Sequence, residues 1–122
     1  MTLVHALPIR DLRSKVGNQT GCGGMAVILV DFEPSAAFEV VNAVTEIRPN
    51  LGGDQELVDF CVANVADGVR LELLEHLGEL PAVRVVVREV FPHAVDSNES
   101  VNRRAGQDVT RQALRLSLTD VW

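Results

Sequence analysis

Residues 82–91 read AVRVVVREVF, and this stretch decides the fold. Val83, Val85 and Val87 point to one side of an extended chain, while two arginines point to the other. Such alternation is typical of a β-strand with one buried face and one solvated face. The sequence therefore predicts a strand here that contributes its valine side to a core.

A long helix is predicted before this strand, over residues 54–77. Apolar side chains recur every four positions, which forms one apolar stripe along a helix. Asp54 suits the N-cap position, and Gly78 suits the end of the helix. Gly68 lies on the apolar side, where glycine costs about 1 kcal/mol relative to alanine. We therefore expect it to pack closely against a strand.

A second helix is predicted after the strand, over residues 97–118. Either Asp96 or Ser97 is expected to cap it, and Asp96 has capping-box spacing to Glu99. The expected inner stripe comprises Val101, Ala105, Val109, Ala113 and Leu116. The opposite, solvent-facing side is expected to carry Arg104, Asp108, Arg111 and Arg115.

The N-terminal half is predicted to supply the other strands of the sheet. Residues 3–16 suit a first strand broken by Pro8, and residues 17–24, GNQTGCGG, suit a loop because half of them are glycine. Residues 25–33 and 38–47 suit a second and a third strand. The order of elements predicts an α+β fold, a small sheet of about four strands with two helices on one face.

Composition indicates one soluble domain that spans residues 1–122. Hydrophobic residues make up 47% of the chain, and no apolar run approaches the ~20 residues of a membrane span. The N-terminus lacks the features of a signal peptide. Cys22 and Cys61 form no CxxC pair, which fits a reduced cytoplasm. We expect no membrane contact and no cofactor.

Charge is distributed unevenly along the chain, which has a net charge of −6. Residues 31–80 hold eleven acids against two arginines, so this block carries −9 and the rest of the chain +3. An acidic protein is a poor non-specific binder of nucleic acid, but a bipolar one can still present a positive face to RNA.

Three motifs suggest other chemistry, and each fails on its context. Residues 21–26, GCGGMA, match a dinucleotide-binding pattern but open a strand, whereas that pattern should open a helix. The lysine of a phosphate loop is missing after the glycines, so no nucleotide is expected. His93, Asp96 and Ser97 hold the residue types of a hydrolase triad, yet sequence neighbours align poorly as nucleophile, base and orienter. No histidine spacing suggests a metal site.

Three stretches, in this order, resemble domain IV of translation elongation factor G. The first is QTGCGG at residues 19–24, followed by Glu33-Pro34; the second is Phe38 with Asn42, followed by a helix that carries Gly68; the third is HAVDSNE at residues 93–99, followed by Ala105-Gly106. Together they cover residues 17–115.

This resemblance implies the fold of the second domain of ribosomal protein S5, with a left-handed βαβ crossover. It also implies that the glycine loop and the histidine loop meet at a tip that contacts ribosomal or other structured RNA, with His93 the most exposed residue. RNA binding further predicts that Arg84 and Arg88 converge with the tip. The expected RNA-binding residues are Gln19, Thr20, Gly21, Gly23, His93, Asp96, Ser97, Arg103 and Arg104.

The glycine loop departs from the family pattern in having lost an Arg, a Gln and a Tyr. These side chains are the ones best suited to phosphate and base contact. An alternative expectation is therefore a protein-interaction or homo-oligomerisation module that kept the fold and lost RNA binding. No constellation in the sequence favours an enzyme.

Overall fold

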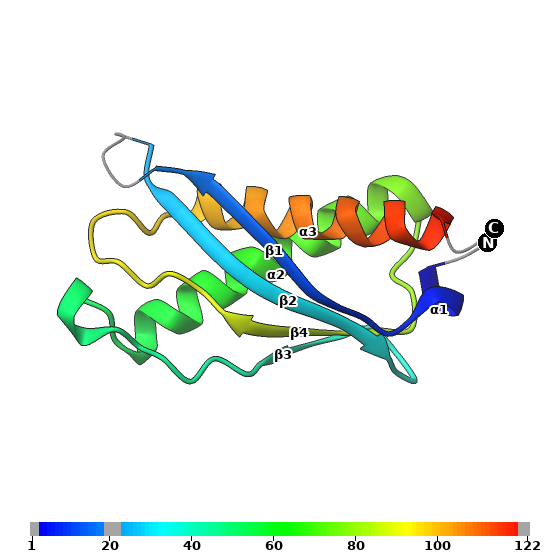
Figure 1. Cartoon of the computed structure of the whole chain (residues 1–122), viewed down its shortest axis with the longest axis horizontal. Coiled ribbons are helices and arrows are strands. Elements are labelled where there is room, and N and C mark those ends of the chain that lie inside the picture. Colours follow the sequence, from blue (N-terminus) through cyan, green and yellow to red (C-terminus); the bar gives the residue numbers. More distant parts are fainter. Residues whose placement is uncertain (1–2, 19–22, 120–122) are drawn as a thin grey trace.

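A four-stranded sheet with two long helices on one face forms the protein (Figure 1). The computed structural model describes residues 3–18 and 23–119. The strands are β1 (Ile9–Gly17), β2 (Met25–Pro34), β3 (Glu39–Asn42) and β4 (Val83–Glu89); the long helices are α2 (Gln55–Leu77) and α3 (Glu99–Thr119); the short ones are α1 (Leu3–Ala6) and the 3₁₀ turn η1 (Pro49–Leu51).

The strands follow the order β1-β2-β4-β3. β1 pairs with β2 and β2 with β4 in antiparallel fashion, whereas β3 and β4 are parallel neighbours joined through α2. In Figure 1, α2 passes behind the sheet on the way from β3 to β4, which makes this crossover left-handed. Most βαβ units are right-handed, so this hand is a distinctive property of the fold. The predicted α+β class is confirmed.

The core lies between the sheet and the two helices. Val83, Val85 and Val87 of β4 are fully buried, as the alternation in residues 82–91 predicts. Cys61 also lies in this core. Four of the five residues of the expected α3 stripe are buried, but Leu116 is 45% exposed.

Two predicted strands differ from the structure. Residues 3–6 form the short helix α1, and the first strand begins only at Ile9, after Pro8. The third strand stops at Asn42 and does not reach residue 47. The Asn42 side chain accepts a hydrogen bond from the Val44 amide (3.0 Å), and such a local turn diverts the backbone from the ladder.

The helix caps match the sequence at one end and differ at another. Asp54 caps α2 by accepting from the Leu57 amide (2.8 Å), as predicted. For α3 neither Asp96 nor Ser97 is the cap. Asn98 is the cap, since its side-chain oxygen accepts from the Val101 amide (3.0 Å). The capping-box spacing misled because the helix begins two residues later than expected.

Two glycines allow α2 and α3 to touch backbone to backbone. A Cβ atom on Gly68 would overlap the Arg103 carbonyl, and one on Gly106 would overlap the Val65 carbonyl. The expectation that Gly68 packs against a strand is therefore wrong: it packs against a helix.

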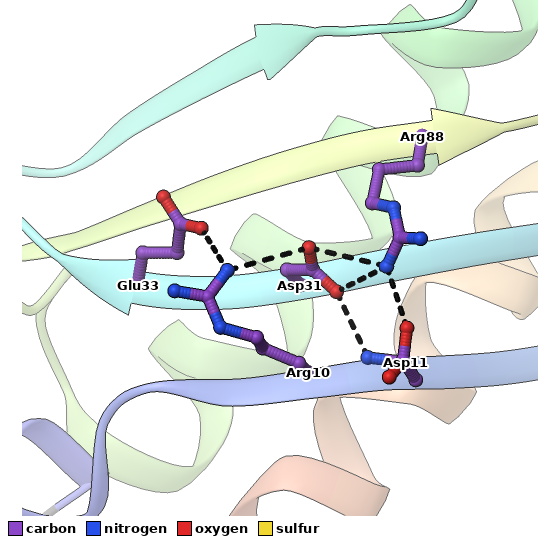
Figure 2. A network of polar contacts seen from close by, with 5 residues as sticks. All are labelled: Arg10, Asp11, Asp31, Glu33 and Arg88. Carbon is purple, nitrogen blue, oxygen red and sulfur yellow. Dashed lines mark hydrogen bonds and ion pairs between the residues drawn. The ribbon is translucent and has the colours of Figure 1, made fainter.

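The face of the sheet away from the helices carries a network of ion pairs (Figure 2). Asp31 is only 4% exposed, although it lies on this open face. Its carboxylate accepts from the Asp11 amide (2.8 Å) and pairs with Arg88 (3.0 Å), while Arg10 bridges to Glu33 (2.6 Å). Asp11 sits at a β-bulge with a φ of 61°, so Asp31 holds a strained backbone position in place.

Across residues 3–18 and 23–119, none of the helices combines the length and the apolar character that crossing a membrane requires.

Candidate functional site

Three segments meet at one end of the molecule, which we call the tip: residues 23–24 of the glycine loop, residues 48–53, and residues 91–98 (Figure 1). The Met25 amide donates to the Asp96 carbonyl (3.0 Å), and the Asn98 side-chain amide donates to the Gly23 carbonyl (2.8 Å). The two loops that the resemblance places together thus lie together here.

Glycines make this close approach possible. Gly24 has a φ of 84°, and a Cβ atom on it would overlap the Asp96 carbonyl and the Asn98 side chain. A Cβ atom on Gly53 would overlap the carbonyls of Ile47 and Pro92, so a side chain there would push residues 91–98 away from residues 48–53.

His93 shapes its own loop. Its Nδ1 atom accepts hydrogen bonds from the amides of Val95 (3.2 Å) and Asp96 (3.1 Å), so the ring proton lies on Nε2. The Asp96 carboxylate lies 3.6 Å from Nδ1. Because Nδ1 already accepts hydrogen bonds from two amides, it carries no hydrogen that it could donate to this carboxylate. The ring also stacks on Phe91 with centroids 5.5 Å apart.

Ser97 is likewise hydrogen-bonded within the loop, whereas Asp96 is only buried in it. Asp96 is 4% exposed, and its Oδ2 atom is buried without a hydrogen-bond partner in the described structure. The Ser97 hydroxyl donates to the Phe91 carbonyl (2.8 Å) and accepts from the His93 amide (2.9 Å).

The residue that projects from the tip is Val95, which is 83% exposed. The expectation that His93 is the most exposed residue is wrong, because its side chain is only 20% exposed. Its backbone-directed hydrogen bonds turn the ring inward and force Val95 out.

The glycine-loop candidates fall into two groups. Gln19, Thr20 and Gly21 lie outside the described residues. Gly23 is exposed, and a Cβ atom added to it would meet no atom of residues 3–18 or 23–119 within 4 Å. Its backbone is therefore open to a ligand.

The arginines do not converge on one face. Arg84 and Arg88 lie on the open face of the sheet, where acids pair with them, whereas Arg103 and Arg104 belong to α3 on the other side. Asp11 and then Asp31 raise the pKa of Arg88 above its ordinary value, which reflects this pairing. Arg103 pairs with Glu99 (3.1 Å). The expected joint positive face is therefore absent from the described structure.

Polar side chains underlie the tip. Burial raises the pKa of the Cys61 thiol, and hydrogen bonding with the Ser97 and Asn102 side chains opposes that shift. Asn102 donates to the Asn98 carbonyl (2.9 Å). Within residues 3–18 and 23–119, no group of three His, Cys, Asp or Glu side chains is placed to hold a metal ion.

Two features of this end escaped the sequence reasoning. Residues 48–53 were assigned no role from the sequence, yet the Leu51 carbonyl accepts from the Ala94 amide (3.0 Å) and braces the histidine loop. The Gly52-Gly53 pair was the available signal. Lys15, the sole lysine, is among the residues that line a hollow next to Gly17. Its place just before the glycine loop was the signal there.

Comparison with known proteins identifies the fold and nothing more. No protein-family model and no curated protein matches the chain. A solved protein from Thermus thermophilus, ttk003000868, superposes with a TM-score of 0.62 at 13% identity. The match covers 88% of this chain and 15% of that one, so this chain spans a small part of its length. The class defined here is a two-layer α+β domain with a left-handed crossover and a tip of three joined segments.

Proposed function

We propose that this cytoplasmic domain binds structured RNA, such as that of the ribosome, through its tip and without catalysis. The observation that carries the proposal is the joining of the glycine loop to the histidine loop by the Met25–Asp96 and Asn98–Gly23 hydrogen bonds. Loops fixed in this way lose little conformational entropy when they bind a partner.

The chemistry of the tip suits contact with a nucleic-acid backbone. Gly23 presents an uncovered main chain, and backbone amides of this kind can approach phosphate oxygens closely. Val95 offers an exposed apolar side chain on the histidine loop. His93, Asp96 and Ser97 act indirectly, since they set the shape of the loop that presents Val95.

Co-sedimentation of the whole chain with ribosomal particles across a salt series tests this proposal. Val95→Glu adds a negative charge at an exposed position and should weaken binding, because it repels phosphates. The matched control, Ala36→Glu, adds the same charge on the exposed β2–β3 turn at the opposite end and should leave binding unchanged. Absence of binding by the unaltered protein at low salt would refute RNA binding.

One observation favours a second candidate function, docking to another protein or to a second copy. Of the eleven exposed large apolar side chains among residues 3–18 and 23–119, seven belong to elements at the end opposite the tip: Val4, Leu71, Leu74, Leu77, Leu80, Leu116 and Leu118. Val4, Leu77 and Leu80 line one hollow there, and apolar surface that gathers in one place marks interaction sites. A mass by light scattering that rises with concentration would support it.

A further inference from the structure

An exposed aromatic side chain lies on α2 near the tip. Phe60 is 39% exposed, whereas the other three phenylalanines of the chain are buried or half-buried. Phe38 and Phe91 have partners for their rings, namely Arg70 and His93. Phe60 has no such ring contact with any described residue. Its ring is therefore available to a partner.

A hollow of about 350 Å³ includes this ring in its wall, and we call it the acidic hollow. Its lining comprises Gly52, Asp54, Glu56, Leu57, Phe60 and Ala94. Glu56 and Phe60 are four residues apart on α2, so their side chains are neighbours on the helix surface. Ala94 belongs to the histidine loop, and its amide donates to the Leu51 carbonyl (3.0 Å). The hollow is therefore built between segments that are hydrogen-bonded to each other.

The lining of the acidic hollow carries negative charge and no positive charge. Its two charged residues are Asp54 and Glu56. One Asp54 oxygen caps α2 by accepting from the Leu57 amide (2.8 Å), and Glu56 has no hydrogen bond or ion pair with any described residue. Arg48, in the same segment as Gly52, does not line the hollow and pairs with Glu46 (3.4 Å). The hollow therefore attracts cations.

Helix capping accounts for only part of this arrangement. Acids are common in the first turn of a helix, where the positive end of the dipole stabilises them. This explains Asp54 and Glu56, but an exposed Phe60 beside them has no role in capping. The wall is also closely fitted, because Gly52 has a φ of 79° and a Cβ atom on it would overlap Ala94. An exposed ring, two carboxylates and a closely fitted wall together indicate a binding site.

An arginine side chain suits this lining better than other cations do. Its planar guanidinium stacks on an aromatic face and also forms forked hydrogen bonds to a carboxylate. Lysine carries a compact charge without this planar group. A hard metal ion needs more oxygen ligands than two carboxylates supply. The phosphates of RNA are repelled by both acids.

We propose that the acidic hollow binds an arginine side chain from a basic segment of a partner protein. The guanidinium stacks on Phe60 and pairs with Glu56. Arginine is one of the residues that carry most of the binding energy at protein interfaces, so one such anchor gives the surface its specificity. This inference goes beyond the proposed RNA binding and does not depend on it.

The acidic hollow and the glycine loop lie against different parts of the histidine loop. Gly23 joins the histidine loop through Asn98, whereas the hollow includes Ala94. In Figure 1 the histidine loop lies between the start of β2 and η1. The hollow can therefore be tested separately from RNA binding.

Fluorescence anisotropy with the full chain and a labelled peptide of alternating arginine and glycine tests this proposal. Phe60→Leu keeps an apolar side chain but removes the aromatic face, and should weaken binding about two- to fivefold. Glu56→Gln removes one carboxylate and should also weaken binding about two- to fivefold. The matched control, Glu75→Gln, removes the same charge from an exposed position at the other end of α2 and should leave the affinity nearly unchanged. Thermal melts establish that each variant folds.

The outcomes separate the acidic hollow from general attraction and from RNA. Equal losses in Glu56→Gln and Glu75→Gln would show that the peptide only follows the net charge. Unchanged affinity in Phe60→Leu, or equally tight binding of a peptide with lysine in place of arginine, would exclude a stacked guanidinium. Weaker RNA binding by Glu56→Gln would assign the hollow to nucleic acid and overturn the proposal. Failure to bind the peptide at low salt refutes the hollow alone, and failure to bind ribosomal particles refutes RNA binding alone.

Discussion

Asp31 stabilises one part of the open face of the sheet through two contacts. Its carboxylate receives the amide of Asp11, whose backbone adopts a left-handed conformation, and pairs with the guanidinium of Arg88. Glu33, two residues further along β2, forms its ion pair with Arg10 and supports no strained backbone position in the described structure. The two acids lie on the same strand but should therefore contribute differently to the free energy of unfolding.

Asp31→Ala should lower the free energy of unfolding by about 2–3 kcal/mol, because a charged hydrogen bond is lost and the Asp11 amide is left unpaired. Glu33→Ala is the matched control and should cost less than about 1 kcal/mol, as exposed ion pairs do. Urea unfolding measures both. Equal effects of the two changes would show that Asp31 is merely another surface charge.

Cys61 should make stability depend on alkaline pH. Burial raises its pKa above the ordinary value of 9.0, so above that pH an unfolded chain loses the thiol proton while the folded protein keeps it. The unfolded state then binds fewer protons, and stability falls as pH rises, by up to about 1.4 kcal/mol per pH unit.

The chain has no tyrosine and one lysine, so few other side chains titrate in this range. Cys61→Ala should flatten the decline in the free energy of unfolding above pH 9.0, even though the variant is less stable at neutral pH. Urea unfolding over a pH series gives the two slopes. Parallel slopes would exclude Cys61 as the source.

At the scale of elements, Asn98 connects a helix to a loop. Its oxygen caps α3 through Val101 and its amide nitrogen binds the Gly23 carbonyl. Asn98→Asp should keep the cap, since Asp also caps helices, but lose the donor to Gly23. Exchange of the Met25 amide should then accelerate with little loss of helix stability.

Asn98→Ala is the companion variant and should lose both contacts, at a further cost of about 1 kcal/mol for the cap. Hydrogen exchange and urea unfolding together distinguish the two. If Asp and Ala at this position leave Met25 equally protected, Asn98 does not hold the loop.

The crossing of α2 and α3 gives a prediction whose sign opposes helix propensity. Gly68→Ala should gain about 1 kcal/mol from propensity alone, but its Cβ would overlap the Arg103 carbonyl. We expect a net loss of about 1–3 kcal/mol in the free energy of unfolding, typical of overpacking. Asp67→Ala, an exposed neighbour, should change it by less than about 0.5 kcal/mol.

Elements that rest on periodicity were predictable, and those that rest on one side chain were not. The valine alternation in residues 82–91 and the stripe in residues 54–77 reflect burial repeated over many residues. The end of β3 depends on the single Asn42–Val44 hydrogen bond, and the start of α3 on the choice of Asn98 over two neighbours with equal capping ability. Such local competition leaves no periodic trace in a sequence.

At the scale of the whole molecule, the tip lies far from the opposite end, where Leu74 and Leu118 are among the exposed apolar side chains (Figure 1). Changes at one should therefore leave the other unaffected. Leu74→Glu/Leu118→Glu should reduce any concentration-dependent association in light scattering and preserve RNA affinity. Val95→Glu should do the reverse. A variant that alters both readings would show that the two ends act as one surface.

The charge pattern of the molecule was only partly visible in the sequence. The net charge and the acidic block over residues 31–80 follow from counting. Counting does not show which basic side chains remain without an acidic partner. Arg84 and Arg88 pair with acids from other strands, whereas Lys15 and Arg104 form no ion pair in the described structure. Pairing across strands depends on register, and register follows from the fold.

The amide group of Asn98 is planar, so its oxygen and its nitrogen move as one rigid unit. A force that pulls the glycine loop outward acts first on the nitrogen, through the Gly23 carbonyl, and rotates the oxygen away from the Val101 amide. Displacement of the loop and fraying of the first turn of α3 are therefore coupled through this one side chain. A partner that displaces the glycine loop would therefore also have to overcome the stability of the first turn of α3.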